Sequence, residues 1–73
     1  MDSKQQIQLK FGTALKKALK LKKLSLREFA LEADMEYSHV QRIATGKVNL
    51  ELTTIIAIAK GLDMTPEELF SFY

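Results

Sequence analysis

The segment from Leu24 to Gly46 constrains the fold most, because it contains two short amphipathic patterns separated by a turn with no room for a loop. Ser25 can cap the first helix, and Glu28, three residues later, can complete a capping box. The patterns predict one helix over about 25–33 and a second over about 36–44.

The second helix of the pair has few residues that favour burial. Val40 and Ile43, three positions apart, form its only apolar stripe. The other positions form an outer face of polar and amphipathic side chains: Tyr37, Ser38, His39, Gln41 and Arg42. Because such a helix adds little to a core, we expect its outer face to carry the function.

Three further helices are predicted around this pair, and no alternating strand pattern is present. Apolar residues recur with a helical period over about 3–22. Asn49 is expected to cap a fourth helix that ends at Gly61, and Thr65-Pro66 opens a fifth that runs into the early seventies. The expected fold is therefore all-α, with five helices in a single domain, 1–73. Its expected core is apolar: Phe11, Leu15, Ala18, Leu24, Phe29, Ala30, Ala33, Met35, Val40, Ile43, Leu52, Ile55, Ala59, Leu62, Met64 and Leu69.

Composition excludes several classes of protein. The 73 residues include one histidine and no cysteine, which argues against disulfides and structural zinc. No apolar run approaches the roughly 20 residues that span a bilayer, and the N-terminus lacks the apolar region of a signal peptide, so we expect a cytoplasmic protein. Without a glycine-rich phosphate loop or a buried acidic pair, we expect neither an enzyme nor a cofactor.

Charge is unevenly distributed along the chain. Residues 1–27 contain eight Lys or Arg and one acid, whereas residues 28–73 contain three Lys or Arg and eight acids. A basic half favours a polyanion such as nucleic acid. The alternative is that the lysines only keep the outer face of the first helix in water: Lys16, Lys17, Lys20, Lys22 and Lys23.

Five fragments occur in a fixed order without a gap between Phe11 and Phe70. They are Phe11-Gly12-Thr13-Ala14-Leu15, Leu24-Ser25-Leu26-Arg27-Glu28-Phe29-Ala30, Val40 to Lys47, Leu52 to Leu62 and Thr65-Pro66-Glu67-Glu68-Leu69-Phe70. The set resembles the phage-repressor (Cro/C1 or XRE type) helix-turn-helix domains. The resemblance implies a five-helix lambda-repressor-like DNA-binding domain and a sequence-specific, repressor-type transcriptional regulator. Such domains usually bind a two-fold DNA operator as a homodimer, with the third helix in the major groove.

The resemblance also implies site residues. Arg42 can donate two hydrogen bonds to guanine O6 and N7, and Gln41 can pair with adenine. The expected base contacts lie on the recognition helix, about 36–44: Tyr37, Ser38, Gln41 and Arg42. The expected phosphate contacts are Ser25, Arg27, His39, Thr45, Lys47 and Asn49. The alternatives are a solvated arginine at position 42 and a Tyr37 that is partly buried over the preceding helix.

Several residues depart from the family pattern. Leu26 stands where the family often has a phosphate-binding glutamine, Glu36 is a poor helix cap, and Lys23 replaces a helix-ending glycine. Leu19 and Ala44 replace an arginine and a glutamate that form a buried ion pair in many members. Because both charges are absent together, we expect Leu19 to contact Ala44, an apolar exchange that costs little.

The chain ends in an aromatic segment. We expect a dimer contact through Phe70, Phe72 and Tyr73; the alternative is that Phe70 closes the core and the last residues fray. Leu26 and Glu36 also support a second hypothesis for the whole protein. In that hypothesis the domain keeps its fold as a protein-interaction module and binds DNA weakly or not at all.

Overall fold

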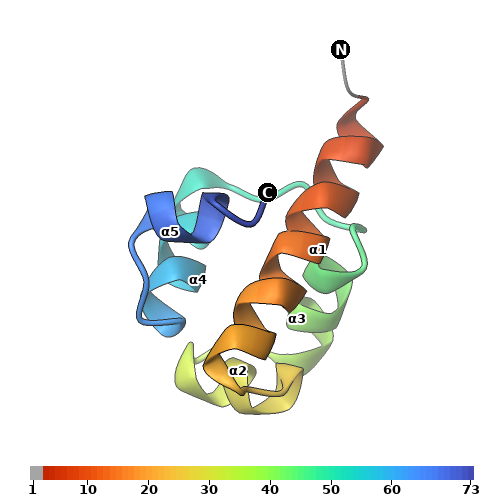
Figure 1. Cartoon of the computed structure of the whole chain (residues 1–73). Helices are drawn as coiled ribbons and strands as arrows, with labels where there is room; N and C mark the ends of the chain where they lie inside the picture. Colours follow the sequence, from red (N-terminus) through yellow and green to blue (C-terminus); the bar gives the residue numbers. More distant parts are fainter. Residues whose placement is uncertain (1–2) are drawn as a thin grey trace.

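The computed structural model describes residues 3–73, which form five α-helices and no strand (Figure 1). The expected all-α fold is therefore confirmed. The helices are α1 (Lys4–Lys22), α2 (Leu26–Glu32), α3 (Tyr37–Ala44), α4 (Leu52–Gly61) and α5 (Pro66–Phe70).

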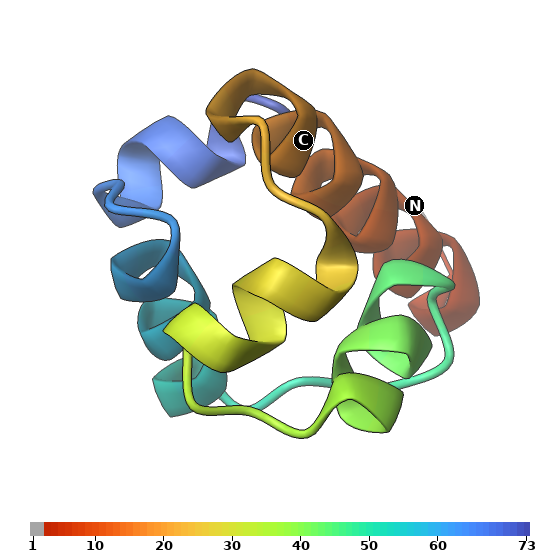
Figure 2. The same cartoon turned by 90° about the horizontal axis from the view of Figure 1, so that it is seen from below.

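The five helices surround one apolar core. The long α1 lies beside α3 in both views, while α4 and α5 lie on the other side of α2 (Figures 1 and 2). Every helix contributes at least one side chain that is almost completely buried: Leu15, Phe29, Val40, Ile43, Ile58, Leu62 and Leu69. The helix-turn-helix pair therefore rests on a core built by the whole domain.

Three helices begin with capping boxes. In α2 the Ser25 hydroxyl accepts a hydrogen bond from the Glu28 N–H at 3.0 Å, and the Glu28 carboxylate accepts one from the Ser25 N–H at 2.9 Å. Thr65 and Glu68 form the same pair at α5. These hydrogen bonds, the backbone one foremost, lower the pKa of Glu28 and of Glu68 below the ordinary value of 4.5. The α1 box uses the uncharged Gln6.

The start of α4 differs from the expectation. Asn49 was expected to cap this helix, but the N-cap is Glu51, whose side chain makes no capping hydrogen bond. Val48 and Leu50 pack against the core and keep the preceding loop extended, so that the helix begins only at Leu52. The expected cap at Asn49 was therefore wrong.

The predicted core is largely confirmed, with one error in α4. Leu52 is 72% exposed, because the first residue of α4 lies beyond the edge of the core. The buried stripe of this helix includes Ile58, which is fully buried and was not predicted. Five other predicted core residues are half-buried and pack against the core: Leu24, Ala33, Met35, Ile55 and Met64.

Gly12 sets how closely α1 approaches α3. A Cβ at this position would lie 2.5 Å from the Ala44 carbonyl oxygen and 2.8 Å from the Ile43 carbonyl oxygen. Gly46 ends the turn after α3 with φ +74°, a left-handed conformation that favours glycine. Only glycine at position 12 lets α1 pack this tightly against the end of α3.

The end of α1 is closed without a glycine. Lys23 adopts the left-handed conformation, φ 58° and ψ 40°, and its N–H donates a hydrogen bond to the Lys20 carbonyl. The Leu24 N–H donates to the Leu19 carbonyl at 3.0 Å, which completes a Schellman motif. A lysine in this conformation stores about 1 kcal/mol of strain that a glycine would not.

Candidate nucleic-acid interface

The outer face of α3 is exposed, as its sequence predicts. Val40, Ile43 and Ala44 are buried in the core, while Ser38, Gln41 and Arg42 are exposed. These three side chains present a hydroxyl, an amide and a guanidinium on the side of α3 that faces away from the core. Together they can donate and accept hydrogen bonds toward a polar surface that lies along the helix.

The Arg27 guanidinium lies over the Tyr37 ring, a contact that the sequence pattern did not predict. The Tyr37 ring is half-buried against the core, and the Arg27 guanidinium carbon lies 4.3 Å from the ring centroid. This geometry is that of a cation–π contact between α2 and the first residue of α3. The alternative of a Tyr37 that is partly buried over the preceding helix is thus confirmed, and its expected place on the exposed outer face of α3 was wrong.

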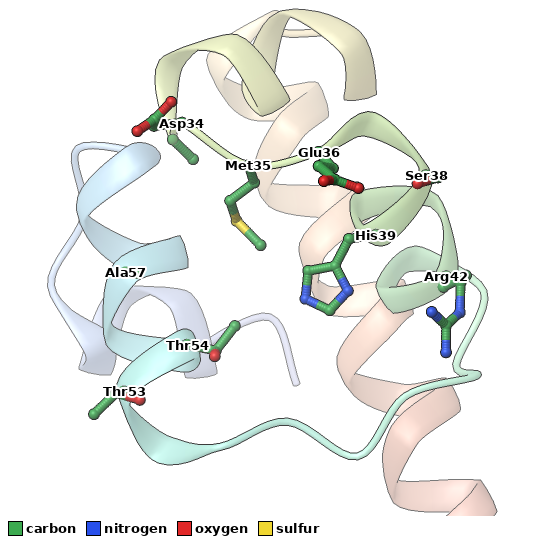
Figure 3. A pocket seen from close by; sticks show the side chains of 10 residues that line it. Asp34, Met35, Glu36, Ser38, His39, Arg42, Thr53, Thr54 and Ala57 are labelled. Carbon is green, nitrogen blue, oxygen red and sulfur yellow. The ribbon is translucent and has the colours of Figure 1, made fainter.

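His39 points toward α4 instead of lying on the outer face. It is half-buried and lines an open groove of about 580 Å³ between α3 and α4, with Met35 and Thr54 across from it (Figure 3). Ser38 and Arg42 line the same groove. The groove therefore brings three of the predicted site residues together beside two threonines, Thr53 and Thr54, that the sequence reasoning did not select.

The remaining residues expected to contact phosphate differ in whether their side chains already make hydrogen bonds within the protein. The Thr45 hydroxyl donates a hydrogen bond to the Gln41 carbonyl at 2.9 Å, so its proton is already used. The Ser25 hydroxyl is engaged as an acceptor in the α2 cap. Lys47 and Asn49 are exposed in the loop between α3 and α4, where their side chains can reach a ligand.

The C-terminal aromatic residues pack back onto α1. The Phe70 ring centroid lies 5.8 Å from that of Phe11 and 6.0 Å from that of Tyr73. Lys10 Nζ lies 4.5 Å from the Tyr73 ring centroid, and Phe72 packs against the core. The last residues thus pack against α1 and the core, while Phe70 and Tyr73 leave 43% and 40% of their surface exposed.

Leu19 and Ala44 are both buried, with 4% and 3% of their surface exposed, and belong to the same core cluster on helices that pack together. No polar or charged side chain is buried anywhere in residues 3–73. A charge introduced at either position would thus meet an apolar environment. Within the same described range, no helix is both long enough and apolar enough to cross a membrane.

Comparison with known proteins agrees with this architecture. A family model described as helix-turn-helix matches residues 15–69, whereas no curated protein matches the chain. Among solved structures, the chain is similar to the restriction-modification controller protein C.AhdI from Aeromonas hydrophila, with a TM-score of 0.82 and 33% sequence identity. The similarity covers 88% of this chain and 97% of that one. The chain therefore belongs to the phage-repressor-like (Cro/C1, XRE-type) helix-turn-helix family of DNA-binding transcription regulators.

Proposed function

We propose that this protein is a sequence-specific, repressor-type regulator that places α3 in the major groove of DNA. The observation that carries the proposal is the exposed face of α3, where Ser38, Gln41 and Arg42 stand opposite the buried stripe. The major groove is about 12 Å wide and admits an α-helix, and its base edges accept hydrogen bonds from the arginine and amide side chains found here.

Within this proposal the site residues have distinct roles. Arg42 and Gln41 read base edges, Ser38 adds a hydroxyl contact, and Tyr37 reaches a base or a phosphate with the edge of its ring that Arg27 leaves free. The phosphate contacts come from the surfaces beside α3: Ser25, Arg27, His39, Thr45, Lys47 and Asn49. His39 contacts a phosphate from the groove beside α4, together with Thr53 and Thr54, which line the same groove.

We further propose that two copies bind a two-fold operator. The exposed parts of Phe70 and Tyr73, with the half-buried Phe72, form the contact between the copies. A closed two-fold dimer would set the two recognition helices about 34 Å apart, one turn of DNA. Sedimentation at micromolar concentration tests this step, since a monomer under those conditions rules out a stable dimer.

The similarity to a restriction-modification controller suggests one biological setting. We propose that this chain controls the transcription of a small operon; the similar solved structure is named as a controller protein of a restriction-modification system. Selection of bound sequences from a random DNA pool tests the proposal. An enriched palindrome supports it, and a pool that stays random overturns it.

Glu36 favours a second candidate function, a protein-interaction module with the same fold. It begins α3 without a side-chain cap and brings a negative charge toward the surface that would meet DNA. Leu26 adds to this, because it cannot bind phosphate. Salt separates the two candidates: binding to DNA weakens with a log–log slope of about −0.9 per neutralised phosphate, and a protein-interaction module shows no DNA binding to weaken.

A further inference from the structure

We propose that an exposed lysine edge, formed by Lys16 and Lys20 of α1 and by Lys23 at its C-cap, binds the DNA backbone beside α3. This edge supplies the phosphate anchor that Leu26 cannot supply. The inference rests on the proposed DNA-binding function, because it assigns the ligand of the lysines as the phosphates of the strand that borders α3. The sequence leaves two explanations of the basic N-terminal half open: binding to nucleic acid, or lysines that only keep the outer face of the first helix in water. The proposal favours the first.

The position of the edge follows from the register of α1. Gly12 faces α3, since a Cβ there would meet the Ala44 carbonyl oxygen. Lys16 and Lys20 follow Gly12 by four and eight residues, spacings that keep them on the same side of α1. Lys23 comes directly after the last helical residue, as the left-handed C-cap of α1, and all three lysines are exposed. The neighbouring positions of α1 and α3 are visible in Figures 1 and 2.

The opposite border of α1 belongs to a different surface. Lys10 lies over the Tyr73 ring, and Phe11 meets Phe70, so this side of α1 faces α5. Lys17, seven residues after Lys10, lies on the same side. The chain thus carries two separate sets of lysines on one helix, and only one set runs along α3.

The faces of α3 agree with this arrangement. Gln41 precedes Ala44 by three residues and so lies toward α1, whereas His39 and Arg42 line the groove toward α4. The exposed face of α3 is therefore flanked by the lysine edge on one side and by the α3–α4 groove on the other. Packed helices are about 8–10 Å apart and the major groove is about 12 Å wide, so a lysine edge beside α3 is within reach of the phosphate backbone that borders the groove.

The charge on the edge is available to a ligand. Between Lys4 and Lys22, α1 contains no acidic residue that could neutralise it. At a rise of 1.5 Å per residue Lys16 and Lys20 lie about 6 Å apart along α1, and Lys23 follows at the end of the helix. The edge is thus long enough to follow a strand that carries one phosphate per 3.4 Å of helix axis. Beyond Lys23 the positive charge continues with Arg27, which lies over the first residue of α3.

The test compares two triple variants of the full chain with the wild type on a mixed-sequence duplex of about 24 base pairs. One variant removes the edge by Lys16→Gln, Lys20→Gln and Lys23→Gln. The other removes three exposed lysines elsewhere, by Lys4→Gln, Lys17→Gln and Lys60→Gln, and so loses the same net charge. Fluorescence anisotropy gives the affinity of each protein between 50 and 200 mM salt, and thermal melts confirm that both variants are folded.

The edge variant should lose up to about 2.7 units of log–log salt slope, 0.9 per phosphate contact. Between 50 and 200 mM salt, the fold loss of affinity should therefore be up to about 40 times smaller for the edge variant than for the wild type. The control variant should lose less than about one unit of slope. An unchanged slope in the edge variant, or equal losses in both variants, overturns the inference and leaves the proposed function intact. A wild type that does not bind the duplex overturns both.

Discussion

Gly12→Ala should destabilise this domain, against the usual trend for a helix interior. Replacing glycine by alanine within a helix normally stabilises by about 1 kcal/mol. Here the new methyl would lie 2.5 Å from the Ala44 carbonyl oxygen and 2.8 Å from that of Ile43, and both are backbone atoms that cannot turn aside. The close approach of α1 and α3 therefore has to open.

The size of the effect is a balance of these two contributions. Overpacking a close contact costs about 1–3 kcal/mol, and contacts with backbone atoms favour the upper part of that range. After subtracting the gain in helix propensity, we expect a net loss of about 1–2 kcal/mol in the free energy of unfolding. For a domain of this size, each kcal/mol shifts Tm by about 4–8 °C, so Tm should fall by about 5–15 °C.

Thermal and urea unfolding followed by circular dichroism measure this change. Thr13→Ala is the matched control, because Thr13 is the next residue of the same helix and is exposed. The control should be neutral or stabilising by a few tenths of a kcal/mol. A Gly12→Ala protein as stable as the wild type, or more stable, would refute the packing of α1 against α3 described here.

Three further tests address other parts of the structure. Ala44→Glu should lower the free energy of unfolding by more than about 2 kcal/mol in urea melts, since an unpaired carboxylate enters the core. The control Ala57→Glu, at an exposed site of α4, should change it by no more than about 0.5 kcal/mol. Equal effects of the two substitutions would contradict the burial of Ala44. Lys23→Gly should raise Tm by a few degrees by removing about 1 kcal/mol of left-handed strain, and no rise would mean that this strain is absent. Glu28 and Glu68 have lowered pKa values, so their contribution to stability is present above pH 4.5 and is lost as the pH falls through the lowered values. The double variant Glu28→Gln, Glu68→Gln should keep both capping boxes, because glutamine fills the same role at Gln6 of α1. In melts between about pH 5 and pH 3, this variant should lose less stability than the wild type. An equal loss in both proteins would mean that the two carboxylates do not cause the loss of stability in acid.

The fold could be predicted from the sequence because its signals are local. The capping box at Ser25, the helix start at Thr65-Pro66 and the period of the apolar residues are each readable within one helix. The error at Asn49 has a tertiary cause, since Val48 and Leu50 pack against the core and delay the start of α4.

The candidate site was less predictable because its side chains interact across helices. A helical pattern shows which side of α3 is polar, but not that Arg27 of α2 covers the Tyr37 ring. It also does not show that His39 turns into a groove toward Thr54. Such contacts depend on how α2 and α4 are placed around α3, and no spacing within the sequence reports that placement.

The most direct test of the central claim is a pair of selections from one random DNA pool, with the wild type and with Arg42→Ala. If the outer face of α3 reads bases, the wild type enriches a palindrome, and the variant loses preference at one base pair in each half-site. On the wild-type sequence, the lost arginine should cost about 1–3 kcal/mol per half-site. A wild type that enriches no sequence, or a variant that enriches the same sequence with unchanged preference at every position, would contradict the account.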